Sequence, residues 1–240
     1  AKTPSNQNIK NFVLLGDPAL MLAYPKMRVR TDNIMNENNG KRADTIQALS
    51  RVTISGHIED LVGNKLDGFN GVLYPSVFDK PVKYKTRKND PTSKIVDFYI
   101  QDKIIYKGEI SVTNGGFSFT FVVPLDISYQ YGEGKISYYA LDTFNLTDAH
   151  GYDPVWIGGS DTLAEADEVG PSIELYLNTL SFTSGDITTP DPLLIARLYD
   201  ESGINFVGNG IGHDLVAVLD GDYQETLILN DHFTPDTDSY

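Results

Sequence analysis

The chain has 240 residues, 40% of them hydrophobic and 11% aromatic, which is enough for one large domain or two small ones with a sizeable core. It contains no cysteine, which excludes disulfides, thiolate metal sites and a cysteine nucleophile. No unbroken apolar run approaches the roughly 18 residues that indicate a transmembrane helix, so we expect no direct membrane insertion.

The net charge of −14 is distributed unevenly along the chain. Residues 1–160 hold 18 basic and 17 acidic side chains, whereas residues 161–240 hold 16 acidic side chains and one basic one, Arg197. A solvated acidic surface is the simplest interpretation, with calcium sites or a surface for a basic partner as alternatives. Nucleic acid is not expected as a partner, because neither half offers a concentrated basic face.

The opening segment predicts a strand followed by a short helix. The apolar run Phe12–Leu15 is typical of a strand buried on both faces. Asp17 suits a helix N-cap and Pro18 the first helical position, so we expect a helix over 19–23. This pattern does not return later in the chain. We therefore expect residues 1–30 to be the last unit of a larger α/β domain whose body lies upstream.

The next segment, residues 31–44, is rich in Asn and Gly and predicts a linker. From residue 45 the hydrophobic period becomes two, as in Val52, Ile54 and Ile58, with polar residues between them. Short alternating strands at intervals of about ten residues predict an antiparallel immunoglobulin-like sandwich over residues 45–158.

The strongest turn signal in this module is Asn114-Gly115, because both residue types accept positive φ. It precedes a strand in which Phe117, Phe119 and Phe121 share one face.

Residues 159–170 predict a second, acidic linker, and residues 171–240 a second β-sandwich. Its length falls short of the roughly 100 residues of a complete immunoglobulin-type sandwich, so we expect it to be truncated. The predicted fold is thus mainly β: two immunoglobulin-like antiparallel β-sandwich modules preceded by a short strand–helix remnant of an α/β domain.

Several blocks of the sequence carry a family resemblance. They are Leu15–Leu20, Ala23–Pro25, Val122–Ile127, Gly132–Ala140, Gly170–Ile173, Leu194–Asn205 and Gly210–Asp214. Together they resemble the C-terminal region of the bacterial type IX secretion system sortases, which are gingipain-like cysteine peptidases. The resemblance implies that residues 1–30 end a caspase-like peptidase domain. It also implies a parent enzyme at the cell surface, on the outer membrane, that cleaves a sorting domain from exported cargo and attaches the cargo to lipopolysaccharide.

The resemblance implies a Cys–His dyad in the parent enzyme, but neither member can be placed here. The chain has no cysteine, and its four histidines, His57, His150, His213 and His232, lie in polar-face or loop contexts. No nucleophile-elbow sequence is present, although composition alone does not exclude a Ser/His/Asp triad. We also interpret Gly208–Gly212 as a turn rather than a phosphate-binding loop, because no Lys-Ser/Thr follows it. We therefore predict no catalytic and no cofactor-binding residues.

Metal binding has only weak support. Acidic turns could offer oxygen ligands to Ca²⁺, but they lack a complete ligand spacing, and we predict no metal site and no cofactor. The acidic residues concerned are Asp220, Asp222, Asp231, Asp236 and Asp238.

Two modification motifs remain as hypotheses. Asp44-Thr45-Ile46 and Asp161-Thr162-Leu163 resemble O-glycosylation sites of exported bacterial proteins, with Thr45 and Thr162 as acceptors. Both fall at predicted linkers. Asn145 fits the N-glycosylation pattern but has little weight for such a protein.

The functional hypothesis is a non-catalytic scaffold region of such a sortase. Its expected partners are its own upstream peptidase domain and other secretion components or cargo. The alternative is a free-standing adhesin or glycan-binding module, which would use exposed aromatics such as Tyr129, Tyr131 and Trp156. A self-contained enzyme is the third and least favoured hypothesis.

Overall fold

The structure is a computed structural model that describes residues 17, 19, 23–164, 167, 169–205 and 214–239. The predicted strand over 12–15, most of the predicted helix over 19–23 and the glycine-rich turn over 208–212 lie outside these residues. The side chain of Asp17 accepts the backbone N–H of Ala19 at 2.8 Å, as a helix N-cap would. Across the described part of the chain, no helix is long and apolar enough to cross a membrane.

Nearly all of the regular secondary structure in the described chain is strand, which confirms the predicted mainly β class. The first module holds β1 (Met27–Asn36), β2 (Lys41–Arg42), β3 (Thr45–Ala48), β4 (Arg51–Glu59), β5 (Gly71–Phe78), β6 (Val82–Lys85), β7 (Asp97–Ile100), β8 (Ile104–Lys107), β9 (Ile110–Val112), β10 (Gly116–Val122), β11 (Gly132–Asp142) and β12 (Thr147–Ser160).

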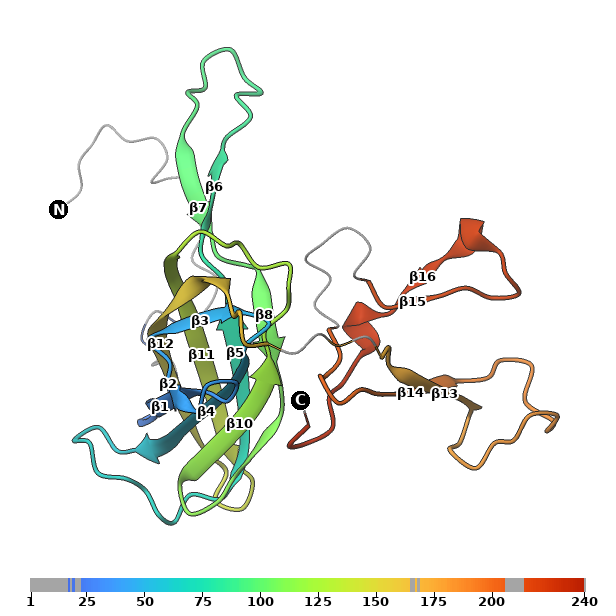
Figure 1. The fold of residues 1–240 in the computed structure, drawn as a ribbon, viewed down its shortest axis with the longest axis horizontal. Coiled ribbons are helices and arrows are strands. Elements are labelled where there is room, and N and C mark those ends of the chain that lie inside the picture. The colour runs from blue at the N-terminus through green and yellow to red at the C-terminus, as the bar shows by residue number, and fades with distance from the viewer. Residues whose placement is uncertain are drawn as a thin grey trace.

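All of these strands except β6 and β7 form one sheet, whose main path runs β10-β4-β1-β12-β11-β5-β8 (Figure 1). β2, β3 and β9 attach to β1, β12 and β5 respectively. Most neighbours are antiparallel, but β12 pairs in parallel with both β1 and β3. The pairing is therefore mixed, whereas the strand periodicity had indicated an antiparallel arrangement.

The predicted linker over 31–44 is wrong, because β1 continues through it to Asn36 and β2 follows. β1 pairs with β4 from Arg28 to Asn36, with a register shift between Thr31 and Asn33. This irregularity disrupts the alternation that would have revealed the strand. Asn36 is only 4% exposed, and its side chain donates to Asp161 at 2.7 Å, so a polar residue occupies an interior position.

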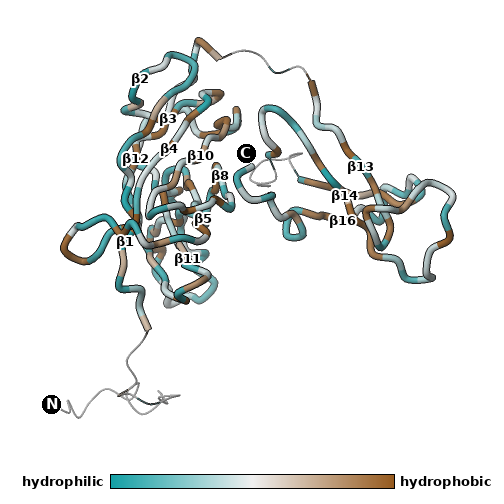
Figure 2. Tube along the Cα trace, turned by 90° about the horizontal axis from the view of Figure 1, so that it is seen from below, coloured by the Kyte–Doolittle hydropathy of each residue, from teal (hydrophilic) through white to brown (hydrophobic). Residues whose placement is uncertain are grey.

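The hydrophobic core lies inside the rolled sheet. Val52, Ile54 and Ile58 of β4 are fully buried, as their alternation predicted. Asn114 and Gly115 adopt φ of 50° and 66°, so the predicted turn joins β9 to β10. Figure 2 shows hydrophobic segments running through these strands.

Aromatic side chains close the roll where its two terminal strands meet. Tyr106 of β8 stacks on Phe119 and Phe121 of β10, with ring centroids 5.3 and 4.5 Å apart. Phe117 contacts the ring of Tyr138 on β11, at 5.6 Å. All three phenylalanines are buried, which confirms their predicted inward face.

The C-terminal region, residues 161–239, is smaller and more open. Its elements are β13 (Ser172–Leu177), β14 (Leu194–Tyr199), β15 (Val216–Ala217), η2 (Tyr223–Glu225), β16 (Leu227–Ile228) and η3 (Asn230–His232). The strands of this region form two separate two-stranded sheets, one of β13 with β14 and one of β15 with β16. Ile173 and Leu175 are 59% and 62% exposed, and no described residue of this region belongs to the buried core. A second immunoglobulin-like sandwich and its truncation stay predictions.

We expect Phe119→Ala to lower the free energy of unfolding by about 3–5 kcal/mol, because it removes a buried ring and leaves a cavity beside Tyr106. The matched control is Phe98→Ala on β7, where the side chain is 40% exposed and lies outside the core. Urea unfolding followed by fluorescence measures both variants. Equal losses would contradict the assignment of the core.

Candidate functional site: an inter-module groove and a basic arm

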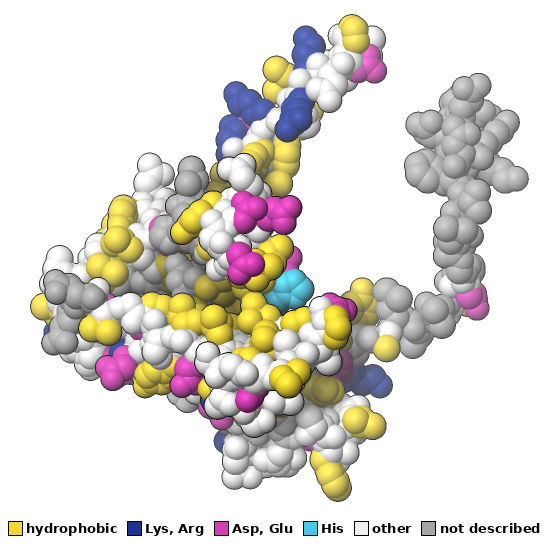
Figure 3. All heavy atoms as spheres, turned by 90° about the vertical axis from the view of Figure 1, so that its right-hand side faces the viewer, with side chains coloured by type: hydrophobic (Ala, Val, Ile, Leu, Met, Phe, Trp, Pro, Cys, Tyr) yellow, Lys and Arg dark blue, Asp and Glu magenta, His cyan; other side chains and the backbone are white. Residues whose placement is uncertain are grey.

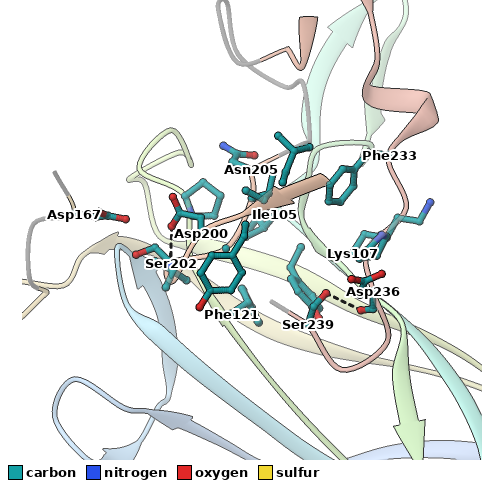
Figure 4. A pocket seen from close by; sticks show the side chains of 18 of the residues that line it. Ile105, Lys107, Phe121, Asp167, Asp200, Ser202, Asn205, Phe233, Asp236 and Ser239 are labelled. Atoms are coloured by element: carbon teal, nitrogen blue, oxygen red, sulfur yellow. Dashed lines mark hydrogen bonds between the residues drawn. The ribbon is translucent and has the colours of Figure 1, made fainter. Parts of the chain in front are cut away.

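A groove of about 1020 Å³ lies between the first module and the C-terminal region (Figure 4). From the first module it is lined by Ile105, Tyr106 and Lys107 of β8 and by the end of β10. From the C-terminal region it is lined by Ala196–Tyr199 of β14 and by residues 232–236. The groove thus unites segments that are far apart in the sequence.

The charged side chains that line the groove are mostly acidic. Five are carboxylates, those of Asp126, Asp167, Glu174, Asp200 and Asp236, and two are the cations Lys107 and Arg197. Asp167 and Asp200 lie towards one end of the view in Figure 4, and Lys107 and Asp236 towards the other. A hydrogen bond from the Ser202 side chain holds the pKa of Asp167 below its ordinary value, so this carboxylate stays charged.

Hydrogen bonds hold the chain's end against the first module. The Ser111 N–H and hydroxyl both donate to the Asp238 carboxylate at 2.7 Å, and the Asp238 N–H donates to the Glu109 carbonyl at 2.8 Å. The Thr237 hydroxyl donates to the Glu109 carboxylate at 2.7 Å. On the other side, Arg51 donates to the carbonyl of Glu201 at 3.0 Å. These contacts position one wall of the groove against the other.

A second surface feature is the arm, residues 82–100, in which β6 pairs only with β7 (Figure 1). Every side chain of these two strands is exposed, including Tyr84 and Phe98, whose rings stack at 5.9 Å. The arm holds five basic and two acidic residues, whereas the remainder of the chain holds 14 basic and 31 acidic ones. Figure 3 shows Lys and Arg side chains gathered along it. The arm is therefore a basic, aromatic projection on an acidic protein.

The base of the arm is fixed by a buried ion pair. Lys80 Nζ lies 2.6 Å from the carboxylate of Asp79, and both side chains are largely buried. Lys80 also donates to the carbonyls of Ser128 and Ile157, and Asp79 accepts the N–H of Ser128. The junction of β5 with the arm is thereby tied to two other segments.

The described histidines form no catalytic arrangement with a nucleophile. His57 Nδ1 lies 2.9 Å from Asp32, and its Nε2 lies 3.7 Å from Glu59, as expected for a hydrogen-bonded surface histidine. His150 and His232 are exposed, and His213 lies outside the described residues.

Within the described ranges, no group of three or more His, Asp or Glu side chains could hold a metal ion. Two of the acidic residues considered for Ca²⁺ accept hydrogen bonds from the protein. Asp222 accepts the N–H of Gln224, and Asp238 binds Ser111.

The two candidate glycosylation motifs differ in their structural settings. Thr45 begins β3, where it pairs with Trp156, and the next residue, Ile46, is fully buried. The accessible linker expected at Thr45 is therefore wrong. Thr162 is exposed just after β12. Modification at either residue stays a prediction.

Asp161, beside Thr162, is only 7% exposed. Burial alone favours its neutral form, but Asn36, Asn38 and the N–H of Leu163 donate to its carboxylate. The net effect is a pKa of Asp161 below its ordinary value of 3.8.

No family model matches the chain, and no curated protein matches it. The structure is similar to the crystal structure of dimeric latent PorU from Porphyromonas gingivalis, with 29% identity, 93% of this chain covered and a TM-score of 0.59. This similarity supports a PorU-like relationship. It spans 21% of the length of that PorU structure.

A second solved structure, the sporulation control protein Spo0M from Bacillus subtilis, is 16% identical. It covers 57% of this chain and 51% of its own length, with a TM-score of 0.33, which is too low to indicate a shared fold.

We expect Asp161→Asn to destabilise the chain at pH 7, with the difference from wild type shrinking below about pH 4. A carboxylate with a lowered pKa contributes stability above its unfolded pKa and loses this contribution as the pH falls. Urea unfolding at pH 7 and at about pH 3 measures the difference, and the exposed Asp44→Asn is the control. A pH-independent difference would contradict the assignment.

Proposed function

We propose that this chain is a non-catalytic, β-rich scaffold from the C-terminal region of a type IX secretion sortase, downstream of its peptidase domain. The parent is a gingipain-like cysteine endopeptidase that processes secreted cargo and attaches it at the cell surface. In this role the first module contacts the upstream peptidase domain, and the arm and the groove contact other secretion components or cargo.

The observation that carries the proposal is the similarity to PorU over 93% of the chain, which spans only 21% of the PorU structure. The absence of cysteine agrees with a non-catalytic role, because a cysteine peptidase needs its thiolate. His57 is paired with two carboxylates, and no described residue lies beside it as an activated nucleophile.

The docking role is supported by the arm. Exposed aromatic and basic side chains are enriched at protein interfaces, and an isolated two-stranded hairpin gains little stability by itself. The arm is firmly anchored at Asp79 and Lys80 but contributes nothing to the core. These properties suit an element that binds a partner.

The glycan-binding alternative has less support. Tyr129, Tyr131 and Trp156 are exposed by 49%, 64% and 54%, as that hypothesis requires. None of the three lines the large groove.

The non-catalytic assignment predicts that the purified chain does not hydrolyse fluorescently labelled casein above the buffer rate. Release of labelled peptides over several hours is the measurement. The same assay with an active cysteine peptidase, with and without iodoacetamide, is the control. Hydrolysis that rises with chain concentration and stays with the chain through purification would refute the assignment.

The docking assignment predicts that replacing residues 82–100 by a short Gly-Ser turn in the natural host reduces removal of sorting domains from exported cargo. The purified variant is expected to keep the melting temperature of wild type, because the arm lies outside the core. Immunoblotting of the outer-membrane fraction measures cargo processing. A Gly-Ser replacement of the exposed turn at 143–146 is the matched control, and equal effects of both would count against the arm.

A further inference from the structure

The arm, residues 82–100, sorts its side chains onto two faces of different chemistry. Residues paired across two strands share a face, and successive residues of one strand alternate between faces. β6 and β7 pair Val82 with Ile100 and Tyr84 with Phe98, so these four apolar side chains share one face. Each of them is at least 38% exposed. The arm therefore carries an apolar face that lies outside the described core.

The opposite face of the arm is cationic. Lys83 and Lys85 of β6 point to it, and the pairing continues beyond β6, because the Thr86 N–H donates to the Val96 carbonyl at 3.0 Å. Alternation then places Arg87 on the same face. Side chains two residues apart on a strand are separated by about 7 Å. The three cations thus form a line with the spacing of a β-strand.

Most of the arm's cations have no acidic partner within the described chain. Lys83 Nζ lies 2.6 Å from the carboxylate of Asp97. The other four cations form no ion pair with any described residue; they are Lys85, Arg87, Lys88 and Lys94. Their positive charge is therefore available to an external anion.

The interactions of β6 all lie within the arm. β6 pairs with β7 and with no other described strand. Its side-chain contacts are the ion pair of Lys83 with Asp97 and the stacking of Tyr84 on Phe98. In Figure 3 the arm stands out from the body of the chain, with Lys and Arg side chains along it. A partner segment can therefore lie alongside β6 and reach both faces of the arm.

The pattern of β6 selects the chemistry of the partner. A strand-like segment beside β6 also alternates, so one set of its side chains lies beside the cations and the other beside the apolar face. Carboxylates in the first set and apolar groups in the second complement both faces, because opposite charges across a strand pair are favourable. A planar anionic surface, such as a membrane, meets only one face of the hairpin at a time. The arrangement therefore favours a polypeptide.

We propose that the arm binds a single extended segment of a partner protein in which acidic and apolar residues alternate. The segment runs alongside β6. Its carboxylates meet Lys85 and Arg87, and its apolar side chains pack beside Val82 and Tyr84. This inference rests on the proposed docking role of the arm and names the chemistry of the segment that the arm recognises.

The test uses the full chain and three labelled synthetic peptides of eight residues, measured by fluorescence polarisation. The first alternates Glu with Val or Tyr, the second carries Gln in place of Glu, and the third carries Lys. We expect the Glu peptide to bind at least about ten-fold more tightly than either of the others. Its affinity should fall several-fold between about 50 and 500 mM NaCl, because salt screens exposed charges.

Charge variants locate the binding on the cationic face. Lys85→Gln combined with Arg87→Gln removes two cations from the line, and we expect about five-fold weaker binding of the Glu peptide. The matched control is Lys41→Gln combined with Arg42→Gln on β2, where both side chains are exposed and the net charge changes equally. This control should change the affinity by less than about two-fold.

The apolar face is tested separately. Phe98→Ala should weaken binding of the Glu peptide several-fold and leave the melting temperature of the free chain nearly unchanged, because the ring lies outside the core. Phe144→Ala is the matched control, since Phe144 is 91% exposed and lies in a turn away from the arm. It should leave the affinity unchanged.

Equal affinity for the Glu and Gln peptides, or no binding of the Glu peptide, would overturn the proposal. Binding to phosphatidylglycerol vesicles that the Lys85/Arg87 double variant abolishes, without binding of the Glu peptide, would identify a membrane as the occupant. Self-association in sedimentation experiments that the same variant abolishes would identify a second copy of this chain.

The proposed docking role has its own readout in cargo processing. If replacement of the arm impairs processing but the Glu peptide does not bind, the acidic segment is refuted and the docking role stands. If the Glu peptide binds but replacement of the arm leaves processing unchanged, the recognition stands and the role in secretion is refuted.

Discussion

The ring of Tyr106, held between those of Phe119 and Phe121, is the contact on which the structure depends. These side chains close the rolled sheet at the one place where its terminal strands, β8 and β10, are not joined by a backbone ladder. Stacked aromatic rings can hold two strands together without using their hydrogen-bonding groups. The closure therefore stabilises the core through side-chain packing between strands that are far apart in the sheet.

Hydrogen bonds connect the first module with the C-terminal region. The contacts of Asp238 with Ser111 and of Arg51 with Glu201 hold β14 beside the groove. The arm is anchored elsewhere, at Asp79 and Lys80, so its environment is separate from that of the groove.

The groove and the arm also differ in charge. The charged side chains that line the groove are mostly acidic, whereas the arm carries a local excess of basic residues. Opposite charges on separate surfaces suit partners of different chemistry and discourage the binding of one partner at both sites.

The sequence by itself determined the mainly β class, the buried alternation of β4 and β10, the turn at Asn114-Gly115 and the absence of a cysteine nucleophile, because these depend on local periodicity and composition. Only the tertiary structure decided that β1 runs through the expected linker, since its pairing with β4 and β12 and the contact of Asn36 with Asp161 join residues far apart in the chain. The groove could not be predicted for the same reason. Its walls come from strands about 90 residues apart, and no local pattern records which distant segments will meet.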